Sequence, residues 1–306
     1  YKRQYCRCAE TPIFLYIMED CMKTGIVFEG GAFRTIFSCG VMDALVENNI
    51  MPDYMIGVSA GAAYGVSMAS RQPGRNLNVL MKYRNDKRYL GIENMFDKNN
   101  RSVYGLEFSY ETIPNELNLF DYDSFMAYKG DFYCVVTNIL TGQPEYMKYT
   151  GKDHTNTVLK ATCALPMLFP PIVIDNIPYM DGGLTDSIPF KRAFNDGCDK
   201  VLVILTREAG YSKHTSGSTK AIAKSYEKTY PRLSDALLSR AERYNACLHE
   251  LEEYEKNGDV MIIRPAVSKG FSRLEKDKNK ILSMYNDGYN QCYEKLWNIR
   301  SFLHIK

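Results

Sequence analysis

The residues of this chain with the clearest potential for chemistry lie at positions 57–61, which read GVSAG. Ser59 follows the short apolar run 54–56 and precedes a small-residue stretch with helical character. This is the nucleophile-elbow pattern, in which a sharp strand-to-helix turn exposes a serine hydroxyl. The helix after Ser59 would aim its first N–H groups at developing negative charge. The strand–turn–helix context favours a serine nucleophile, with Gly57 and Gly61 allowing the turn, over a segment that merely packs tightly.

A serine nucleophile needs a base. Asp181 stands at the end of an apolar run and is followed by two glycines, and an aspartate so placed can take the serine proton directly. The order Ser59, Asp181, His214 also fits an α/β-hydrolase triad, in which the histidine comes last. However, only one predicted strand precedes the strand that carries Ser59, which is early for that fold. We therefore expect that no histidine is catalytic; the chain has four (His154, His214, His249 and His304).

An acyl-transfer site also needs donors for the oxyanion. Residues 29–34 (EGGAFR) form a strand-to-helix loop just upstream of the serine strand. Two consecutive glycines let backbone N–H groups turn inward, so the loop has the composition of an oxyanion hole. A phosphate-binding glycine loop is the competing interpretation, but neither G-x-G-x-x-G nor G-K-[ST] is present.

Alternating strand and helix patterns would position these motifs. The predicted strands are 25–28, 54–56, 131–139, 145–149, 172–174, 177–180, 200–206 and 260–264. The predicted helices, besides the one after Ser59, are about 34–48, 157–163, 190–196, 220–229, 232–257 and 274–303. The order strand, loop, helix, strand, serine, helix at the start predicts a parallel α/β unit.

Together, the motifs 29–34, 57–61 and 181–183 resemble those of the patatin-like phospholipase family, with residues 164–166 (ALP) ahead of the aspartate. The resemblance extends over about residues 23–300. The segments 230–232 (YPR) and 239–244 (SRAERY) are similar to a bacterial subfamily with a helical C-terminal extension.

This resemblance implies a three-layer α/β/α fold with a mostly parallel sheet, and a Ser59–Asp181 dyad that works without histidine, metal or cofactor. It also implies an oxyanion hole made by the amides of Gly30, Gly31 and Ala32, with Arg34 bracing the loop or the anionic intermediate. Ala32 and Thr35 stand where the family has glycine. We expect Ala32 to take an ordinary φ, so that its methyl group only narrows the pocket.

Composition narrows the class of protein. The net charge of +2 over 306 residues gives no reason to expect nucleic acid as a partner. Nine scattered cysteines, with no zinc-like spacing, indicate reduced thiols and a cytoplasmic protein. No apolar run approaches the ~18 residues of a membrane-spanning helix. The sequence does not indicate an oligomeric state.

We divide the chain into three parts. Glu19 and Asp20 stand where a secretory signal would have its small-residue cleavage site, so we do not expect such a signal. Met22 is a more natural beginning, and residues 1–21 are interpreted as a dispensable extension or a remnant of expression. Residues 22–206 would form the catalytic domain, and 207–306 a mostly helical extension packed on it. Residues 71–88 carry six basic side chains and one acidic one. They are either an ordinary solvated face or a peripheral contact with the inner, anionic membrane face.

The sequence thus predicts a serine lipid acyl hydrolase, a phospholipase or esterase that acts through an acyl-enzyme. Two alternatives remain open. One is a lipid- or acyl-binding protein on the same fold with weak or lost turnover. The other is an esterase of the α/β-hydrolase type that uses His214.

Overall fold

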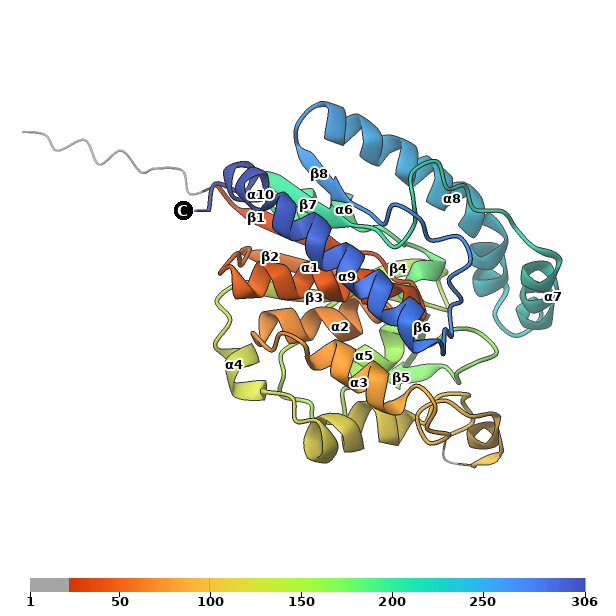
Figure 1. Cartoon of the computed structure of the whole chain (residues 1–306). Coiled ribbons are helices and arrows are strands. Elements are labelled where there is room, and N and C mark those ends of the chain that lie inside the picture. The colour runs from red at the N-terminus through yellow and green to blue at the C-terminus, as the bar shows by residue number, and fades with distance from the viewer. Residues whose placement is uncertain (1–21, 99, 306) are drawn as a thin grey trace, which may run out of the picture.

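The computed structural model describes residues 22–98 and 100–305 (Figure 1). The predicted N-terminal extension, residues 1–21, lies outside the described residues.

An eight-stranded sheet forms the centre of the described part of the chain (Figure 1). Its strands are β1 (Thr24–Phe28), β2 (Tyr54–Val58), β3 (Asp131–Asn138), β4 (Gln143–Lys148), β5 (Ile172–Ile174), β6 (Ile177–Asp181), β7 (Lys200–Ile204) and β8 (Val260–Ile263). The order is β5-β6-β3-β2-β1-β7-β8, with β4 paired to β3 beside this path. Strands β3, β2, β1, β7 and β8 run parallel, whereas β4, β5 and β6 join by antiparallel pairing.

Helices cover both faces of this sheet, because its strands carry apolar side chains on both sides. In β1, Ile26 and Phe28 belong to one buried cluster and Val27 belongs to the other. Parallel strands buried on both faces read as continuous apolar runs, which is how 25–28 and 200–206 appear in the sequence. The predicted three-layer α/β/α fold with a mostly parallel sheet is therefore confirmed.

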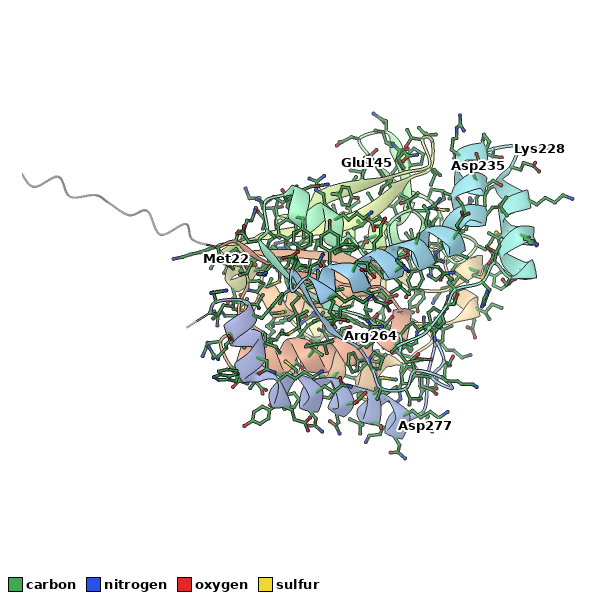
Figure 2. The ribbon with its side chains drawn as sticks, turned by 90° about the horizontal axis from the view of Figure 1, so that it is seen from above. Met22, Glu145, Lys228, Asp235, Arg264 and Asp277 are labelled. Carbon is green, nitrogen blue, oxygen red and sulfur yellow. The ribbon has the colours of Figure 1, made fainter. Side chains whose placement is uncertain are left out.

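The first layer holds α1 (Ile36–Glu47), α2 (Ala60–Ala69), α3 (Arg75–Tyr83), α9 (Lys278–Glu294) and α10 (Leu296–Phe302). The second layer holds α6 (Phe190–Asn195) and α8 (Pro231–Lys256), with α7 (Gly217–Tyr226) packed on α8. In Figure 2, α8, marked by Asp235, and α9, marked by Asp277, lie on opposite sides of the sheet. Shorter elements are η1 (Ala32–Thr35), η2 (Ile92–Phe96), the π-helix η3 (Phe108–Leu117), α4 (Tyr122–Met126), α5 (Thr157–Thr162) and η4 (Gly182–Leu184).

The C-terminal segment is built into both the sheet and the first helical layer. Strand β8 pairs with β7 along Val201–Ile204, so the predicted boundary at residue 206 falls between two hydrogen-bonded strands. Helix α9 crosses α1 closely: a Cβ on Gly40 would lie 2.1 Å from the Tyr285 carbonyl oxygen, and one on Gly288 would lie 2.0 Å from that of Phe37. Only glycine permits this approach of the two helix backbones.

Most predicted elements are present, and the differences have local causes. Helix α3 was not predicted, because the basic side chains in 71–88 obscure the apolar positions that it buries (Val79, Leu80 and Tyr83). The predicted helix 274–303 is two helices: α9 begins after Asp277, whose side chain accepts hydrogen bonds from the N–H groups of Asn279 and Lys280. A break at Lys295 then separates α9 from α10.

Candidate active site

The predicted elbow has the strained geometry of a nucleophile turn. Ser59 joins β2 to α2 with φ +54° and ψ −130°, a conformation that L-residues rarely adopt. Gly61 packs so closely that a Cβ there would lie 2.5 Å from the Phe28 carbonyl oxygen, and one on Gly57 would lie 2.5 Å from the Ala62 Cα. The two glycines are thus required by the approach of α2 to β1 and to β2.

Thr162 holds the serine backbone in place. Its hydroxyl accepts a hydrogen bond of 2.9 Å from the Ser59 N–H and donates one of 2.5 Å to the Val135 carbonyl oxygen. This bridge ties the elbow to α5 and β3. No pattern in the sequence indicates this role of Thr162, because the contact joins residues 103 positions apart.

Asp181 reaches Ser59 through the strand register. Asp181 lies opposite Val136 of β3, and the adjacent Val135 lies opposite Val58 of β2. Strand β6 runs antiparallel to β3 and ends at Asp181, at the level of the sheet where β2 also ends. Ser59 and Asp181 consequently line the same cavity.

The Asp181 carboxylate is held on one side and open on the other. Its Oδ1 accepts a hydrogen bond of 2.8 Å from the Gly183 N–H. Its Oδ2 is buried and has no hydrogen-bond partner among the described residues. Burial raises the pKa of Asp181, while the Arg240 charge and the Ser59 hydroxyl act in the opposite direction. A buried carboxylate oxygen with a free lone pair near a serine hydroxyl can accept the serine proton directly.

The loop 29–34 lies against the elbow. A Cβ on Gly30 would lie 2.7 Å from the Val58 carbonyl oxygen and 2.9 Å from Ser59 Cβ. Within the described part of the chain, the N–H groups of Gly30, Gly31 and Ala32 form no hydrogen bond. The Phe33 N–H, in contrast, donates to the Arg273 carbonyl oxygen at 3.0 Å. The loop therefore presents free amides beside the serine.

The expectation of an ordinary φ at residue 32 is wrong. Ala32 has φ +50°, so it adopts the left-handed conformation that glycine takes without penalty. The loop keeps its path at a steric cost of roughly 1–2 kcal/mol. Thr35 has φ −61° and ψ −6°, ordinary helical values that need no glycine.

Arg34 contributes a buried positive charge to the same cavity. The residue is 6% exposed, and its Nε has no hydrogen-bond partner among the described residues. Burial, with repulsion from Arg207 and Arg273, lowers the pKa of Arg34 to about 10. Its guanidinium still carries a full charge at neutral pH.

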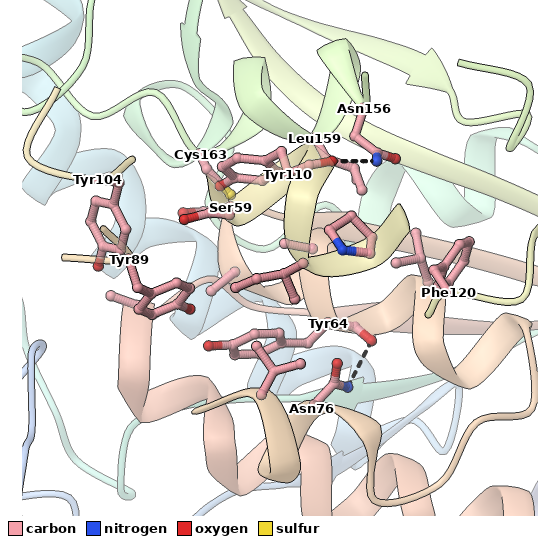
Figure 3. A pocket seen from close by; sticks show the side chains of 18 of the residues that line it. Ser59, Tyr64, Asn76, Tyr89, Tyr104, Tyr110, Phe120, Asn156, Leu159 and Cys163 are labelled. Carbon is pink, nitrogen blue, oxygen red and sulfur yellow. Dashed lines mark hydrogen bonds between the residues drawn. The ribbon is translucent and has the colours of Figure 1, made fainter. Parts of the chain in front are cut away.

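In the part of the chain that the structure describes, Ser59 lines two cavities of opposite character. The first is apolar and has a volume of about 970 Å³, including its opening to solvent. Its walls include Phe33, Tyr64, Val79, Tyr89, Tyr104, Tyr110, Ile113, Phe120, Leu159 and Phe169. Figure 3 shows Ser59 at the edge of this cavity, beside Cys163 and the ring of Tyr110. The second is polar, has a volume of about 540 Å³, and contains Asp181 and Arg34.

The sequence did not predict that the C-terminal segment lines the polar cavity. Six of its lining residues come from the C-terminal segment: Arg207, Tyr211, Lys213, Arg240, Tyr244 and Arg273. The spacing of Arg240 and Tyr244, four residues apart on α8, was the one available sign that both face the same way. The others are scattered and have no shared pattern.

None of the four histidines lines either cavity. His214 is exposed and is next in sequence to Lys213, which does line the polar cavity. His154 is exposed and stacks on Tyr122 at a centroid distance of 4.0 Å. This arrangement favours a base other than histidine.

The basic residues of 71–88 have local partners. Arg75 donates to the carbonyl oxygens of Leu119 and Asn118, and Arg84 donates to the carbonyl oxygen of Lys276. At the surface, Lys87 pairs with Glu93 at 2.7 Å and Arg88 pairs with Asp86 at 2.7 Å. Among the described residues, no helix is both long and apolar enough to cross a membrane.

Comparison with known proteins agrees with this architecture. The family model described as "Patatin-like phospholipase" matches residues 26–194, and a domain of unknown function (DUF6363) matches residues 230–304. The uncharacterized protein YjjU of Escherichia coli (strain K12) is 28% identical over 188 residues, which are 60% of this chain and 52% of YjjU. A lysophospholipase, nte1 of Aspergillus terreus, is 25% identical over 298 residues, which are 91% of this chain and 18% of nte1. The chain therefore spans about half of the first relative and less than a fifth of the second.

Among solved structures, VipD from Legionella pneumophila superposes with a TM-score of 0.45 at 14% identity, covering 91% of this chain and 67% of VipD.

Proposed function

The chain belongs to the patatin-like phospholipase family, and from this premise we propose that it is a serine lipid acyl hydrolase that uses a Ser59–Asp181 dyad. The family supports lipid acyl hydrolysis in general. The observation that carries the dyad is the buried, unpartnered Oδ2 of Asp181, which lines the same cavity as Ser59.

The proposed reaction has two halves. In the first, Ser59 Oγ attacks the acyl carbonyl carbon and Asp181 Oδ2 takes the hydroxyl proton. The tetrahedral intermediate collapses, the ester C–O bond breaks, and the proton passes to the leaving alcohol. In the second, Asp181 takes a proton from water, whose oxygen attacks the acyl carbon of the acyl-enzyme. The bond between Ser59 Oγ and this carbon breaks, Asp181 returns the proton to Ser59 Oγ, and the fatty acid leaves.

The amides of Gly30, Gly31 and Ala32 are the proposed donors to the oxyanion. They form no other hydrogen bond in the described chain and belong to the loop that contacts Ser59 Cβ. The charge of Arg34 stabilises the same intermediate from within the cavity. Donors of this kind typically contribute 10²–10³ in kcat each.

The apolar cavity is the proposed acyl site. Its aromatic and aliphatic walls meet at Ser59, and small-molecule sites are typically lined by such side chains together with a few polar groups. A chain bound there would place its ester at the elbow, with the leaving group toward the polar cavity. The proposed substrate is thus a lipid ester, in keeping with the nte1 relative, which is a lysophospholipase.

A second candidate is a lipid-binding protein with weak or lost turnover. The left-handed Ala32 favours it, because a strained residue in the oxyanion loop destabilises the arrangement that catalysis needs. Both candidates use the same acyl cavity, so catalytic turnover distinguishes them.

We further propose that the enzyme is cytoplasmic. Its catalytic domain would be residues 22–206, and residues 207–306 would form an extension that completes the site. The end of segment 71–88 would make a peripheral membrane contact. The free state of six described cysteines is consistent with a reducing compartment (Cys39, Cys134, Cys163, Cys198, Cys247 and Cys292). Two exposed apolar residues, Ile92 at 66% and Phe96 at 82%, belong to η2. Glu93, which pairs with Lys87, belongs to the same short helix. Tyr89, the residue after Arg88, lines the acyl cavity, so the proposed membrane contact directly adjoins a wall of that cavity in the chain.

A serine-reactive fluorophosphonate probe tests the proposal. The parent protein and a Ser218→Ala control, altered on the exposed start of α7, should be labelled, and Ser59→Ala should not. Mass spectrometry of lipids incubated with the parent and with Ser59→Ala should show released fatty acid for the parent alone. Lipid binding without labelling or release would support the second candidate.

A further inference from the structure

Five cationic side chains converge on the polar cavity next to Ser59. Arg34 comes from the loop before α1, and the other four come from the C-terminal segment: Arg207, Lys213, Arg240 and Arg273. Two carboxylates line the same cavity, Glu29 and Asp181. The cavity therefore carries a strong positive excess within a molecule whose total charge is close to neutral.

These two carboxylates do not neutralise the cations by direct pairing. Glu29 Oε2 accepts hydrogen bonds from the Thr206 N–H and hydroxyl, at 2.6 and 3.0 Å, and its Oε1 accepts one of 2.8 Å from the Tyr244 hydroxyl. Asp181 Oδ1 is bonded to the Gly183 N–H. Among the described residues, none of the five cations forms an ion pair.

The cations are positioned by neutral groups. Lys213 Nζ lies 3.6 Å from the centroid of the Tyr244 ring, and the Arg207 guanidinium lies 4.3 Å from that of Tyr211. Arg240 Nε donates to the Gly183 carbonyl oxygen, whereas the buried Nε of Arg34 has no partner in the described chain. Aromatic faces and carbonyl oxygens orient these charges without cancelling them.

Such a cluster is costly unless an anion occupies it. Burial, together with repulsion from Arg240, lowers the pKa of Lys213 to about 7, and that of Arg34 is lowered to about 10. Like charges that repel one another in a half-buried cavity destabilise the fold, and a structural role would be served better by pairing. Guanidinium groups bind phosphate through paired hydrogen bonds, and an ammonium adds a point charge.

We propose that the polar cavity binds a compact polyanionic headgroup, a phosphate monoester, on the acyl lipid that Ser59 cleaves. This inference rests on the proposed function and names its substrate class. Ser59, Ala32 and Leu165 line both cavities. A bound acylglycerol phosphate would therefore have its chain among the aromatic residues, its ester at Ser59 and its phosphate among the cations.

Free phosphate has the same chemistry, and the experiment separates the two sources. Three substrates with one acyl chain are compared: an acylglycerol phosphate, the corresponding acylglycerophosphocholine and the monoacylglycerol. We expect kcat/KM for the phosphate monoester to exceed that for the neutral glyceride at least tenfold. Equal values, with a saturable effect of inorganic phosphate on both, would identify a site for the free ion and overturn the proposal.

Lys213→Gln and Arg273→Gln should each lower the phosphate-to-glyceride ratio of kcat/KM about tenfold or more, as the loss of a charge-assisted contact implies. The ratio cancels any general effect on folding or on the dyad. Lys228→Gln, which removes an exposed charge before α8, should leave the ratio unchanged. An unaltered ratio in both cavity variants would contradict the headgroup site.

A binding measurement separates this inference from the proposed function. Ser59→Ala protein, titrated calorimetrically below the micelle concentration, should bind the acylglycerol phosphate at least tenfold more tightly than the monoacylglycerol, with an affinity that falls as salt rises. Lys213→Gln in the same background should remove this difference. Preferential binding of the acylglycerol phosphate, with no turnover by the parent protein, would refute the hydrolase and support the headgroup site. Turnover by the parent, with equal affinities for the two lipids, would support the hydrolase and refute the headgroup site.

Discussion

Arg240 Nε donates a hydrogen bond of 2.6 Å to the carbonyl oxygen of Gly183, a residue 57 positions earlier in the chain. The Gly183 N–H in turn donates to Asp181 Oδ1 at 2.8 Å. One glycine thus joins helix α8 to the proposed base. The charge of Arg240 opposes the rise in the pKa of Asp181 that burial causes.

Arg240→Gln should move the acidic limb of the kcat/KM profile to higher pH. Asp181 must be ionised to act as a base, and its pKa is already raised by burial. Removing the nearby positive charge raises this pKa further, so activity is lost at a higher pH as the medium is acidified. Arg240→Lys keeps a positive charge at this position, so its acidic limb should lie closer to the parent's pH than that of Arg240→Gln. A limb at the same pH in parent and Arg240→Gln would show that another group governs the profile.

Ser59→Ala and Asp181→Asn should each reduce hydrolysis of p-nitrophenyl esters to background while leaving the circular dichroism spectrum unchanged. If the two residues act as a unit, the double variant should be little worse than either single one, because such effects are not additive. Full activity in either single variant would exclude the dyad.

Replacement of His154 or His214 by alanine should leave kcat within a few-fold of the parent value. Both side chains are exposed and neither lines a cavity with Ser59. Loss of a general base typically costs 10²–10⁴-fold, so steady-state kinetics resolves the question. A loss in that range for His214→Ala would restore the triad interpretation.

Ala32→Gly should raise the free energy of unfolding by about 0–1.5 kcal/mol, as measured by urea denaturation. The change relieves the steric cost of φ +50°, roughly 1–2 kcal/mol. It also introduces an opposing cost of roughly 0.5–1 kcal/mol, because glycine loses more backbone entropy on folding than alanine does. Ala221→Gly, on an exposed position of α7, should have the opposite sign.

The rate of acyl-enzyme formation in Ala32→Gly should stay within tenfold of the parent value, because Ala32 already has the left-handed conformation. A rise of a hundredfold or more, alone or with Thr35→Gly, would mean that the alanine impairs the oxyanion hole and would favour the binding-protein candidate.

Reversal of Lys87 and Arg88 to glutamate should weaken sedimentation with anionic vesicles, most clearly at low salt. Each basic charge near such a surface contributes about 1 kcal/mol. Arg84 is left intact because it bonds to the Lys276 carbonyl oxygen. The control reverses Lys228 and Lys256, near the two ends of α8. Equal sedimentation of both double variants and the parent would identify 71–88 as an ordinary solvated face.

The sequence by itself determined the fold class and the motifs. Strands such as 25–28 and 200–206 are continuous apolar runs because both faces of the sheet are covered. The elbow 57–61 can be predicted from the sequence because close contacts require glycine at positions 57 and 61. These contacts are made with residues near in sequence or in an adjacent strand, so residue type and spacing are enough to identify the motif. The family follows from the same local patterns.

Only the tertiary structure decided how these pieces meet. Strand β6 ends with Asp181 at the same level of the sheet as Ser59. This match depends on the register of β6 against β3, which residue types alone do not specify. Ala32 takes φ +50° because contacts around its loop outweigh a local preference of roughly 1–2 kcal/mol. The cationic cavity assembles Arg34 with four residues from 207–273, since the packing of α8 and the following segment brings distant side chains together. Isolated charges in a sequence look like surface residues, and only their convergence in space gives them a shared role.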